Sequence, residues 1–250
     1  MDRKKGRAIV ITSGKGGTGK TTSVGTIASC LADMGYKTLC LDCDVGLKNL
    51  DLTLGIPELT LNDFYDCIEG RKTLNEAIVK HPRIPRLYFL SAPMTVKAES
   101  IDKDKMKKLI DEIKDSFDYC LIDSPAGMGA GFELASCGAD MAIIVATGDA
   151  SSIRDGQRVS AELEKQGMES VRLLVNRIKP KLFRRTRSTV DDIIDSVGAR
   201  LIGLVSEDES VTLAANLEIP LILYEKKRAV KQYRNIAGRI TGQRIPIGKI

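Results

Sequence analysis

A glycine-rich loop near the start of the chain limits which folds the sequence can adopt. The loop matches the pattern G-x-x-x-x-G-K-[ST] at every fixed position. Its residues are Gly14, Lys15, Gly16, Gly17, Thr18, Gly19, Lys20 and Thr21. A short apolar run precedes it and a helix-like segment follows, and in that setting backbone N–H groups and a helix N-terminus surround phosphates. The sequence therefore predicts a phosphate-binding loop between a strand and a helix.

Two side chains of this loop have predicted roles in nucleotide binding. Lys20 is expected to bind the β- and γ-phosphate oxygens, and the Thr21 hydroxyl is expected to ligate Mg²⁺. Thr22 follows directly and is grouped with the predicted nucleotide-binding residues. A nucleoside triphosphate and Mg²⁺ are therefore the cofactors that the loop favours.

Short runs rich in aliphatic and β-branched residues predict strands along the whole chain. They are Arg7–Ser13, Lys37–Asp42, Arg86–Ser91, Tyr119–Asp123, Met141–Ala146, Val171–Asn176 and Leu201–Val205. Segments with helical spacing separate most of them, at Thr21–Met34, Lys103–Lys114, Ile153–Gln166 and Val190–Val197. This alternation predicts an α/β fold, a three-layer, doubly wound, mostly parallel sheet with helices on both faces.

Length and composition favour one P-loop domain over residues 1–250. Hydrophobic residues make up 43% and charged residues 28% of the chain, and no linker-like stretch divides it. A last amphipathic helix is predicted over Lys226–Thr241. Its core-facing positions are Val230, Tyr233, Ile236, Ala237 and Ile240.

Three aspartates lie at or just beyond the ends of two predicted strands. Asp42 and Asp44 come at the end of the second strand, and Asp123 ends the strand that begins at Tyr119. The carboxyl ends of parallel strands form the edge that faces bound ligands. A carboxylate there can hold Mg²⁺ through water opposite the phosphate loop, which is the role predicted for Asp123.

Lys15 is a second lysine that the general loop pattern does not require. With it, the loop resembles the deviant Walker A motif of the MinD/ParA family of ATPases. Residues 42–51 resemble the D-x-D-x-G-x-x-N-L-D segment of that family, and residues 123–127 resemble its D-S-P-A-G segment. The resemblance implies an ATP-bound homodimer in which Lys15 reaches the partner's phosphates, Asp44 orients the attacking water, and Asp42 lies near the Mg²⁺ shell. The predicted catalytic residues are Lys15, Lys20 and Asp44.

Two further segments resemble the base-binding regions of the same family. Asn176 and Arg177 end a predicted strand, and the resemblance implies that they read adenine. Residues 206–211 are similar to a P-E-D-x-S-V loop that wraps the base, so Ser206, Glu207 and Asp208 are expected there. Ser206 replaces the usual proline, which loosens the expectation of a rigidly held base.

The resemblance favours a slow Mg²⁺-dependent ATPase switch in the spatial regulation of cell division and septum placement, with activator and effector proteins as partners. Two alternatives stay open. A DNA-partitioning ATPase of the ParA kind would use the basic cluster Lys179–Arg187, although a solvated loop is the favoured interpretation of that cluster. A metallocofactor-assembly ATPase would use Cys40 and Cys43, but strand alternation puts them on opposite faces and favours a structural role.

The single histidine bears on acid/base chemistry, and the last residues of the sequence bear on where the protein acts. His81 precedes Pro82 in an expected loop, which favours an exposed structural role over acid/base chemistry. Residues 245–250 are too short, and too interrupted by Pro246, for a membrane-binding helix. We therefore expect a cytoplasmic protein, peripheral at the inner membrane only through an absent tail or a partner.

Overall fold

The computed structural model describes residues 5–45, 49–56, 62–181 and 189–248. One eight-stranded sheet forms its centre, with strand order β3-β4-β2-β5-β1-β6-β7-β8. Neighbouring strands are parallel, except that β3 pairs antiparallel with β4 at the edge. The strands are β1 (Arg7–Thr12), β2 (Thr38–Asp42), β3 (Val79–Lys80), β4 (Leu87–Leu90), β5 (Tyr119–Asp123), β6 (Met141–Thr147), β7 (Val171–Ile178) and β8 (Arg200–Ser206).

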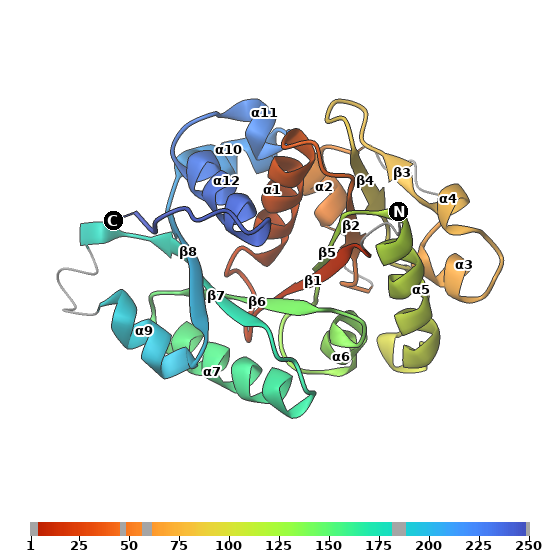
Figure 1. Cartoon of the computed structure of the whole chain (residues 1–250), viewed down its shortest axis with the longest axis horizontal. Helices are drawn as coiled ribbons and strands as arrows, with labels where there is room; N and C mark the ends of the chain where they lie inside the picture. Colours follow the sequence, from red (N-terminus) through yellow and green to blue (C-terminus); the bar gives the residue numbers. More distant parts are fainter. Residues whose placement is uncertain (1–4, 46–48, 57–61, 182–188, 249–250) are drawn as a thin grey trace.

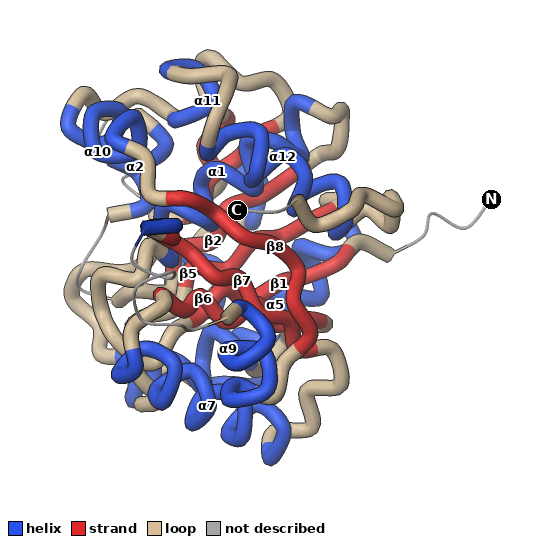
Figure 2. The backbone as a smooth tube through the Cα atoms, turned by 90° about the vertical axis from the view of Figure 1, so that its left-hand side faces the viewer, coloured by secondary structure: helices blue, strands red, loops and turns tan. Residues whose placement is uncertain are grey.

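Helices cover both faces of the sheet (Figure 1). They are α1 (Lys20–Asp33), α2 (Leu50–Leu54), α3 (Phe64–Ile68), α4 (Leu74–Ala77), the 3₁₀ helix η1 (Ala98–Ser100), α5 (Lys103–Ser116), α6 (Ala130–Ser136), α7 (Ala150–Lys165), α9 (Val190–Val197), α10 (Glu209–Asn216), α11 (Leu221–Tyr224) and α12 (Ala229–Ile240). Seen from the side, the strands lie between α1, α10, α11 and α12 above and α7 and α9 below (Figure 2).

Two hydrophobic cores follow from the alternation of side chains along the strands. On β1, Ala8 and Val10 belong to the core that also contains residues of α5, α6, α7 and α9, whereas Ile9 and Ile11 belong to the core that contains residues of α1 and α12. Adjacent strand residues point to opposite faces, so a strand covered on both sides is apolar throughout. The predicted three-layer, mostly parallel α/β fold is therefore confirmed.

Cys40 and Cys43 are fully buried in different cores, Cys40 on the α1 side and Cys43 on the α5 side. The two thiols therefore lie on opposite faces of the sheet, as the alternation predicts, and they cannot ligate one metal ion together. Burial also raises the pKa of both thiols well above the ordinary value. A structural role explains both cysteines.

The prediction that His81 is exposed is wrong. The side chain is buried, with Nε2 2.7 Å from the Leu54 carbonyl oxygen, while Nδ1 accepts hydrogen bonds from the backbone N–H groups of Arg83 and Ile84. This pattern makes Nε2 the donor. Burial lowers the pKa of His81, so the neutral ring holds the loop around Pro82 against the end of α2. Its role is structural, but inside the protein.

None of the helices in the described ranges combines the length and the apolar composition needed to cross a bilayer. The amphipathic helix predicted at the end of the chain is α12, and its five predicted core positions are buried.

Candidate nucleotide site

The phosphate loop lies at the carboxyl end of β1, where the strand order reverses. β1 pairs with β5 on one side and with β6 on the other, so the crevice beyond its end is open to a ligand. The predicted acidic residues meet there, because Asp42 of β2 and Asp123 of β5 are register partners. The structure thus brings together the loop and the carboxylates that the sequence predicts.

Asn176 and Arg177 hold the loop in shape through two successive backbone carbonyls. Asn176 Nδ2 donates to the Thr18 carbonyl oxygen at 2.8 Å, and an Arg177 guanidinium nitrogen donates to that of Gly17 at 3.1 Å. Gly19 has φ 92°, and a Cβ there would lie 2.3 Å from Asn176 Nδ2. Only glycine therefore fits at position 19 while Asn176 contacts the loop.

A β-bulge explains how two consecutive strand residues can reach the same loop. Val175 pairs with Leu204 and Ile178 pairs with Ser206, so Asn176 and Arg177 together oppose a single residue of β8. Arg177 has φ 54°, a left-handed conformation that is uncommon outside glycine. Bulges re-aim side chains beside active sites. Sequence reasoning assigned these two residues to the base and missed their contacts with the loop.

Lys20, Asp44 and Asp123 form a partly buried charged cluster under the loop. Burial lowers the pKa of Lys20, and the carboxylates of Asp123 and Asp44 act in the opposite direction. Burial raises the pKa of Asp123 to about 7, although the Thr21 hydroxyl donates to it and Lys20 lies near. Burial also raises the pKa of Asp44, against the effect of Lys20. Such displaced values are typical of functional sites.

Buried polar atoms without a partner gather at the same place. Within the described residues, they are Thr12 Oγ1, Thr18 Oγ1, Asp42 Oδ2 and Asp123 Oδ1. Burial and the neighbouring Asp123 raise the pKa of Asp42 well above its usual range. Unpaired buried groups cost free energy unless a ligand, an ion or water satisfies them. The site is therefore suited to receive a cation and a polar ligand.

The donor set fits Mg²⁺ held jointly with a nucleotide. Across the part of the chain that the structure describes, no group of three His, Cys, Asp or Glu side chains is arranged to hold a metal alone. Mg²⁺ is usually bound by one or two protein oxygens together with phosphates and water. The Thr21 hydroxyl and the partnerless oxygens of Asp42 and Asp123 are groups of this kind.

Lys15 turns toward α7 of its own chain. Its Nζ lies 2.9 Å from Asp149 Oδ1 and 2.8 Å from Ser151 Oγ. Burial tends to raise the pKa of Asp149, but hydrogen bonds from Lys15, Thr147 and Ser152 outweigh it and hold the pKa below its usual range. Asp149 also caps the N-terminus of α7. The sequence did not indicate Asp149 or Ser151 as partners of this lysine.

A cavity of about 370 Å³ opens beside the loop, and the predicted base-binding residues line it. Its lining comprises Gly17, Gly19, Thr22, Asn176, Arg177, Val205, Ser206, Glu207, Asp208, Val211, Thr212, Ala215, Asn216 and Tyr233. Both Asp208 oxygens already accept backbone hydrogen bonds, Oδ1 from Ser210 N and Oδ2 from Ala229 N. Asp208 therefore shapes the cavity by joining α10 to the start of α12.

Glu207 forms ion pairs with Arg177 at 3.2 Å and with Lys179 at 2.8 Å. Lys179 is the first residue of the basic cluster that the DNA-partitioning alternative would use, and here its charge is paired. Residues 182–187 of that cluster lie outside the described residues, as do residues 46–48 of the segment that follows Asp44.

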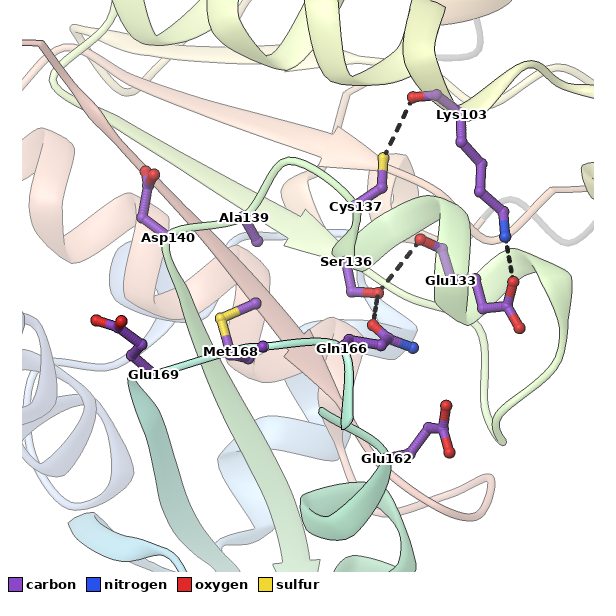
Figure 3. A pocket seen from close by; sticks show the side chains of 11 residues that line it. Lys103, Glu133, Ser136, Cys137, Ala139, Asp140, Glu162, Gln166, Met168 and Glu169 are labelled. Carbon is purple, nitrogen blue, oxygen red and sulfur yellow. Dashed lines mark hydrogen bonds and ion pairs between the residues drawn. The ribbon is translucent and has the colours of Figure 1, made fainter. Parts of the chain in front are cut away.

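A larger cavity, of about 570 Å³, lies at the opposite edge of the sheet (Figure 3). It adjoins residues just before β6 and β7, at the amino ends of those strands. Its polar side chains bind one another, since Ser136 Oγ donates to Gln166 Oε1 at 2.9 Å and Lys103 pairs with Glu133. These contacts join α5, α6 and α7, and the cavity is separate from the phosphate loop.

Comparisons with known proteins agree with this geometry. A family model described as an AAA domain matches residues 6–175. The septum site-determining protein MinD of Bacillus subtilis is 39% identical over 245 residues, which cover 97% of this chain and 91% of that protein. MinD of Synechocystis is 38% identical, covering 96% of this chain and 91% of that protein.

Two solved structures are similar over nearly their whole length. The MinC:MinD cell division protein complex of Aquifex aeolicus matches with a TM-score of 0.90 and 40% identity, over 97% of this chain and 98% of that chain. MinD of Pyrococcus horikoshii complexed with Mg-ADP matches with a TM-score of 0.81 and 27% identity, over 94% of this chain and 95% of that chain. With the phosphate loop, the paired aspartates and these relatives in agreement, the chain belongs to the MinD/ParA family of P-loop ATPases.

Proposed function

We propose that this protein is an Mg²⁺-dependent ATPase switch that dimerises with ATP and acts, like the MinD proteins, in placing the division septum. The observation that carries the proposal is the convergence of Lys20, Thr21, Asp44 and Asp123 beside a cavity of about 370 Å³. Phosphoryl transfer needs positioning and charge neutralisation more than a covalent nucleophile. This cluster can supply both.

Each side chain has a role that follows from its position. Lys20 and the loop N–H groups bind the β- and γ-phosphates. Asn176 and Arg177 donate hydrogen bonds to two carbonyl oxygens of the loop and so hold these carbonyls on their own side. Thr21, Asp42 and Asp123 would hold Mg²⁺, which would neutralise phosphate charge. Asp44 is a partly exposed carboxylate near Lys20, and we assign to it the role of orienting the attacking water, which the resemblance to the family implies.

In the proposed dimer, Lys15 binds different groups from those it binds in the single chain. In the single chain Lys15 is bound by Asp149 and Ser151, and in the proposed dimer it leaves them for the phosphates of the other subunit. An ion pair this exposed contributes about 1 kcal/mol or less, so a phosphate can compete for the lysine. Hydrolysis is then coupled to dimerisation, which is what a switch requires.

The proposal also includes a partner protein and a cellular location. Because the solved A. aeolicus relative is a MinC:MinD complex, we propose a MinC-type partner for this chain. We further propose that the protein works in the cytoplasm and reaches the membrane surface through a partner or a further segment.

The oligomeric state tests the switch. An Asp44→Ala protein should bind Mg·ATP without hydrolysing it, and should therefore accumulate as a dimer, while Mg·ADP leaves it monomeric. Light scattering after size exclusion should give the mass of the 27.3 kDa chain with ADP and about twice that mass with ATP. The same mass with both nucleotides would rule out the switch, and the exposed Asp195→Asn variant, which should turn ATP over normally, serves as the control.

A further inference from the structure

The part of the phosphate loop around Gly17 is held by hydrogen bonds rather than by packing. A Cβ added at Gly16 or at Gly17 would meet no atom of another segment within 4 Å. The described residues contain no cis peptide bond, and in a trans unit the carbonyl and the following N–H point in opposite directions. The hydrogen bond from Arg177 to the Gly17 carbonyl oxygen therefore turns the Thr18 N–H away from Arg177.

Asn176 acts on the next peptide unit in the same way. Because its amide donates to the Thr18 carbonyl oxygen, the Gly19 N–H is turned away from β7 as well. Gly17 and Gly19 have φ 78° and 92°, while Thr18 between them keeps a negative φ. Such an alternation brings consecutive N–H groups to one side of the chain, where they form a concavity that suits an anion. The orientation of these two carbonyls thus decides whether the loop is ready for phosphate.

The guanidinium group of Arg177 is held by two segments at once. Nη1 donates to the Gly17 carbonyl oxygen at 3.1 Å, and Nη2 lies 3.2 Å from Glu207 Oε1. The Arg177 side chain is 54% exposed, and fixing a long exposed side chain costs rotamer entropy. Glu207 limits the positions open to the guanidinium. The backbone N–H of Glu207 itself donates to the Ile178 carbonyl oxygen at 3.0 Å, so Glu207 is anchored beside β7.

Glu207 holds a second cation that does not contact the loop. Its Oε2 lies 2.8 Å from Lys179 Nζ, and among the described residues Lys179 pairs with this carboxylate alone. The hydrogen bond from Lys179 lowers the pKa of Glu207, and the one from Arg177 acts in the same direction. The carboxylate therefore stays ionised at neutral pH. Of its two cations, Arg177 is the one that can pass its influence on to the phosphate loop.

We infer that Glu207 is a positioning residue for the phosphates: it holds Arg177, and Arg177 holds the Gly17 carbonyl, so that the loop N–H groups stay turned toward the phosphates. This role rests on the proposed function, because it takes the loop to bind the phosphates of a nucleotide. The sequence assigned Glu207 to the base, whereas its contacts connect it to the loop.

The sign of the effect separates this role from simple electrostatics. A carboxylate near a phosphate site repels the anion, so its removal would strengthen binding if charge alone mattered. If Glu207 keeps Arg177 in place, its removal weakens binding instead. The two explanations thus predict opposite results for one substitution.

Calorimetric titration of the whole chain with Mg·ADP and with Mg·pyrophosphate, which carries no base, measures this sign. For Glu207→Ala we expect about fivefold weaker binding of both ligands, near the value of one hydrogen bond. Glu207→Gln keeps an oxygen that can accept from Arg177 and should recover most of the loss. Glu209→Ala removes the same charge from the exposed first residue of α10 and should not weaken binding.

The two cations of Glu207 provide a second matched pair. Arg177→Ala and Lys179→Ala each remove one positive charge, but only Arg177 contacts the loop. We expect pyrophosphate affinity to fall about tenfold in the first variant and less than about twofold in the second. In the Arg177→Ala background, Glu207→Ala should not weaken binding further, because the carboxylate then has no guanidinium to hold.

Several results would overturn the proposal. They are unchanged or tighter pyrophosphate binding by Glu207→Ala, equal losses in Arg177→Ala and Lys179→Ala, and additive losses in the double variant. A loss limited to ADP would also overturn it, since Glu207 would then serve the base. A wild-type chain without affinity for Mg·ADP would instead remove the proposed function itself, so the two failures are distinguishable.

Discussion

Replacing Lys20 with alanine is expected to weaken Mg·ADP binding about 100-fold while the fold is kept. Lys20 is 9% exposed at the start of α1, and the loop places its ammonium group beside Asp44 and Asp123. Hydrogen bonds to charged groups are worth about 1.5–3 kcal/mol, and every 1.4 kcal/mol is a factor of ten in affinity. Calorimetry measures the loss, and circular dichroism checks that the variant is folded.

The other loop lysine provides the matched control. Lys15 is bound by Asp149 and Ser151, so Lys15→Ala should change the affinity for Mg·ADP less than about twofold, the error of such a comparison. The same variant should lose ATP-dependent dimerisation and hydrolysis. If both alanine variants lost ADP affinity equally, Lys15 would serve its own subunit's phosphates, and the dimer mechanism would have to be abandoned.

The sequence predicts the features that depend on local pattern. The phosphate loop is contiguous, and Asp42 and Asp123 end strands whose apolar runs are easily recognised. Since the strands are parallel, their ends had to meet at one edge, and the structure places the two carboxylates in register. The seven longer parallel strands and the helices α1, α5, α7, α9 and α12 were predicted for the same reason, because each carries an apolar run or a helical spacing, whereas α6 and α10 were not predicted.

Contacts between distant segments left no local signal. Helical spacing predicts that Tyr233 is buried, but nothing in the spacing tells that its hydroxyl meets Asn176, 57 positions away. Lys15 and Asp149 are 134 positions apart. The short elements were not predicted for another reason: β3 has two residues and α4 has four, too few for their side chains to show a hydrophobic period. The capping box of α4, with Thr73 and Glu76, was the available clue.

Asp123 gives the second large prediction, which concerns stability and pH. In the absence of a ligand, burial raises its pKa to about 7, whereas an unfolded aspartate has the usual value near 3.8. The folded chain therefore binds more protons than the unfolded chain between these pH values, and its stability falls as pH rises through that window. The full difference between the folded and unfolded pKa corresponds to about 4 kcal/mol, by which the free energy of unfolding is lowered above pH 7.

An Asp123→Asn variant removes this cost because the amide is neutral at every pH. Part of the gain is offset, since a buried amide N–H group without a partner costs about 1–3 kcal/mol. That cost is the same at every pH, so the advantage of the variant over the wild-type protein should still grow by about 2–3 kcal/mol from pH 5 to pH 8. Urea unfolding with EDTA and without nucleotide measures it, and Asp195→Asn, a surface change of the same kind, should show no such growth.

Mg·ADP should reverse this order of stability. The ligand stabilises the wild-type protein by mass action, and Asp123, with its partnerless Oδ1, is then beside a cation that favours the ionised carboxylate. The variant keeps the phosphate loop but loses the charge that attracts Mg²⁺, so it gains less from the ligand. At pH 8 the variant should thus be the more stable protein with EDTA and the less stable one with saturating Mg·ADP. If the order stays the same under both conditions, the carboxylate of Asp123 does not serve the metal, and its burial needs another explanation.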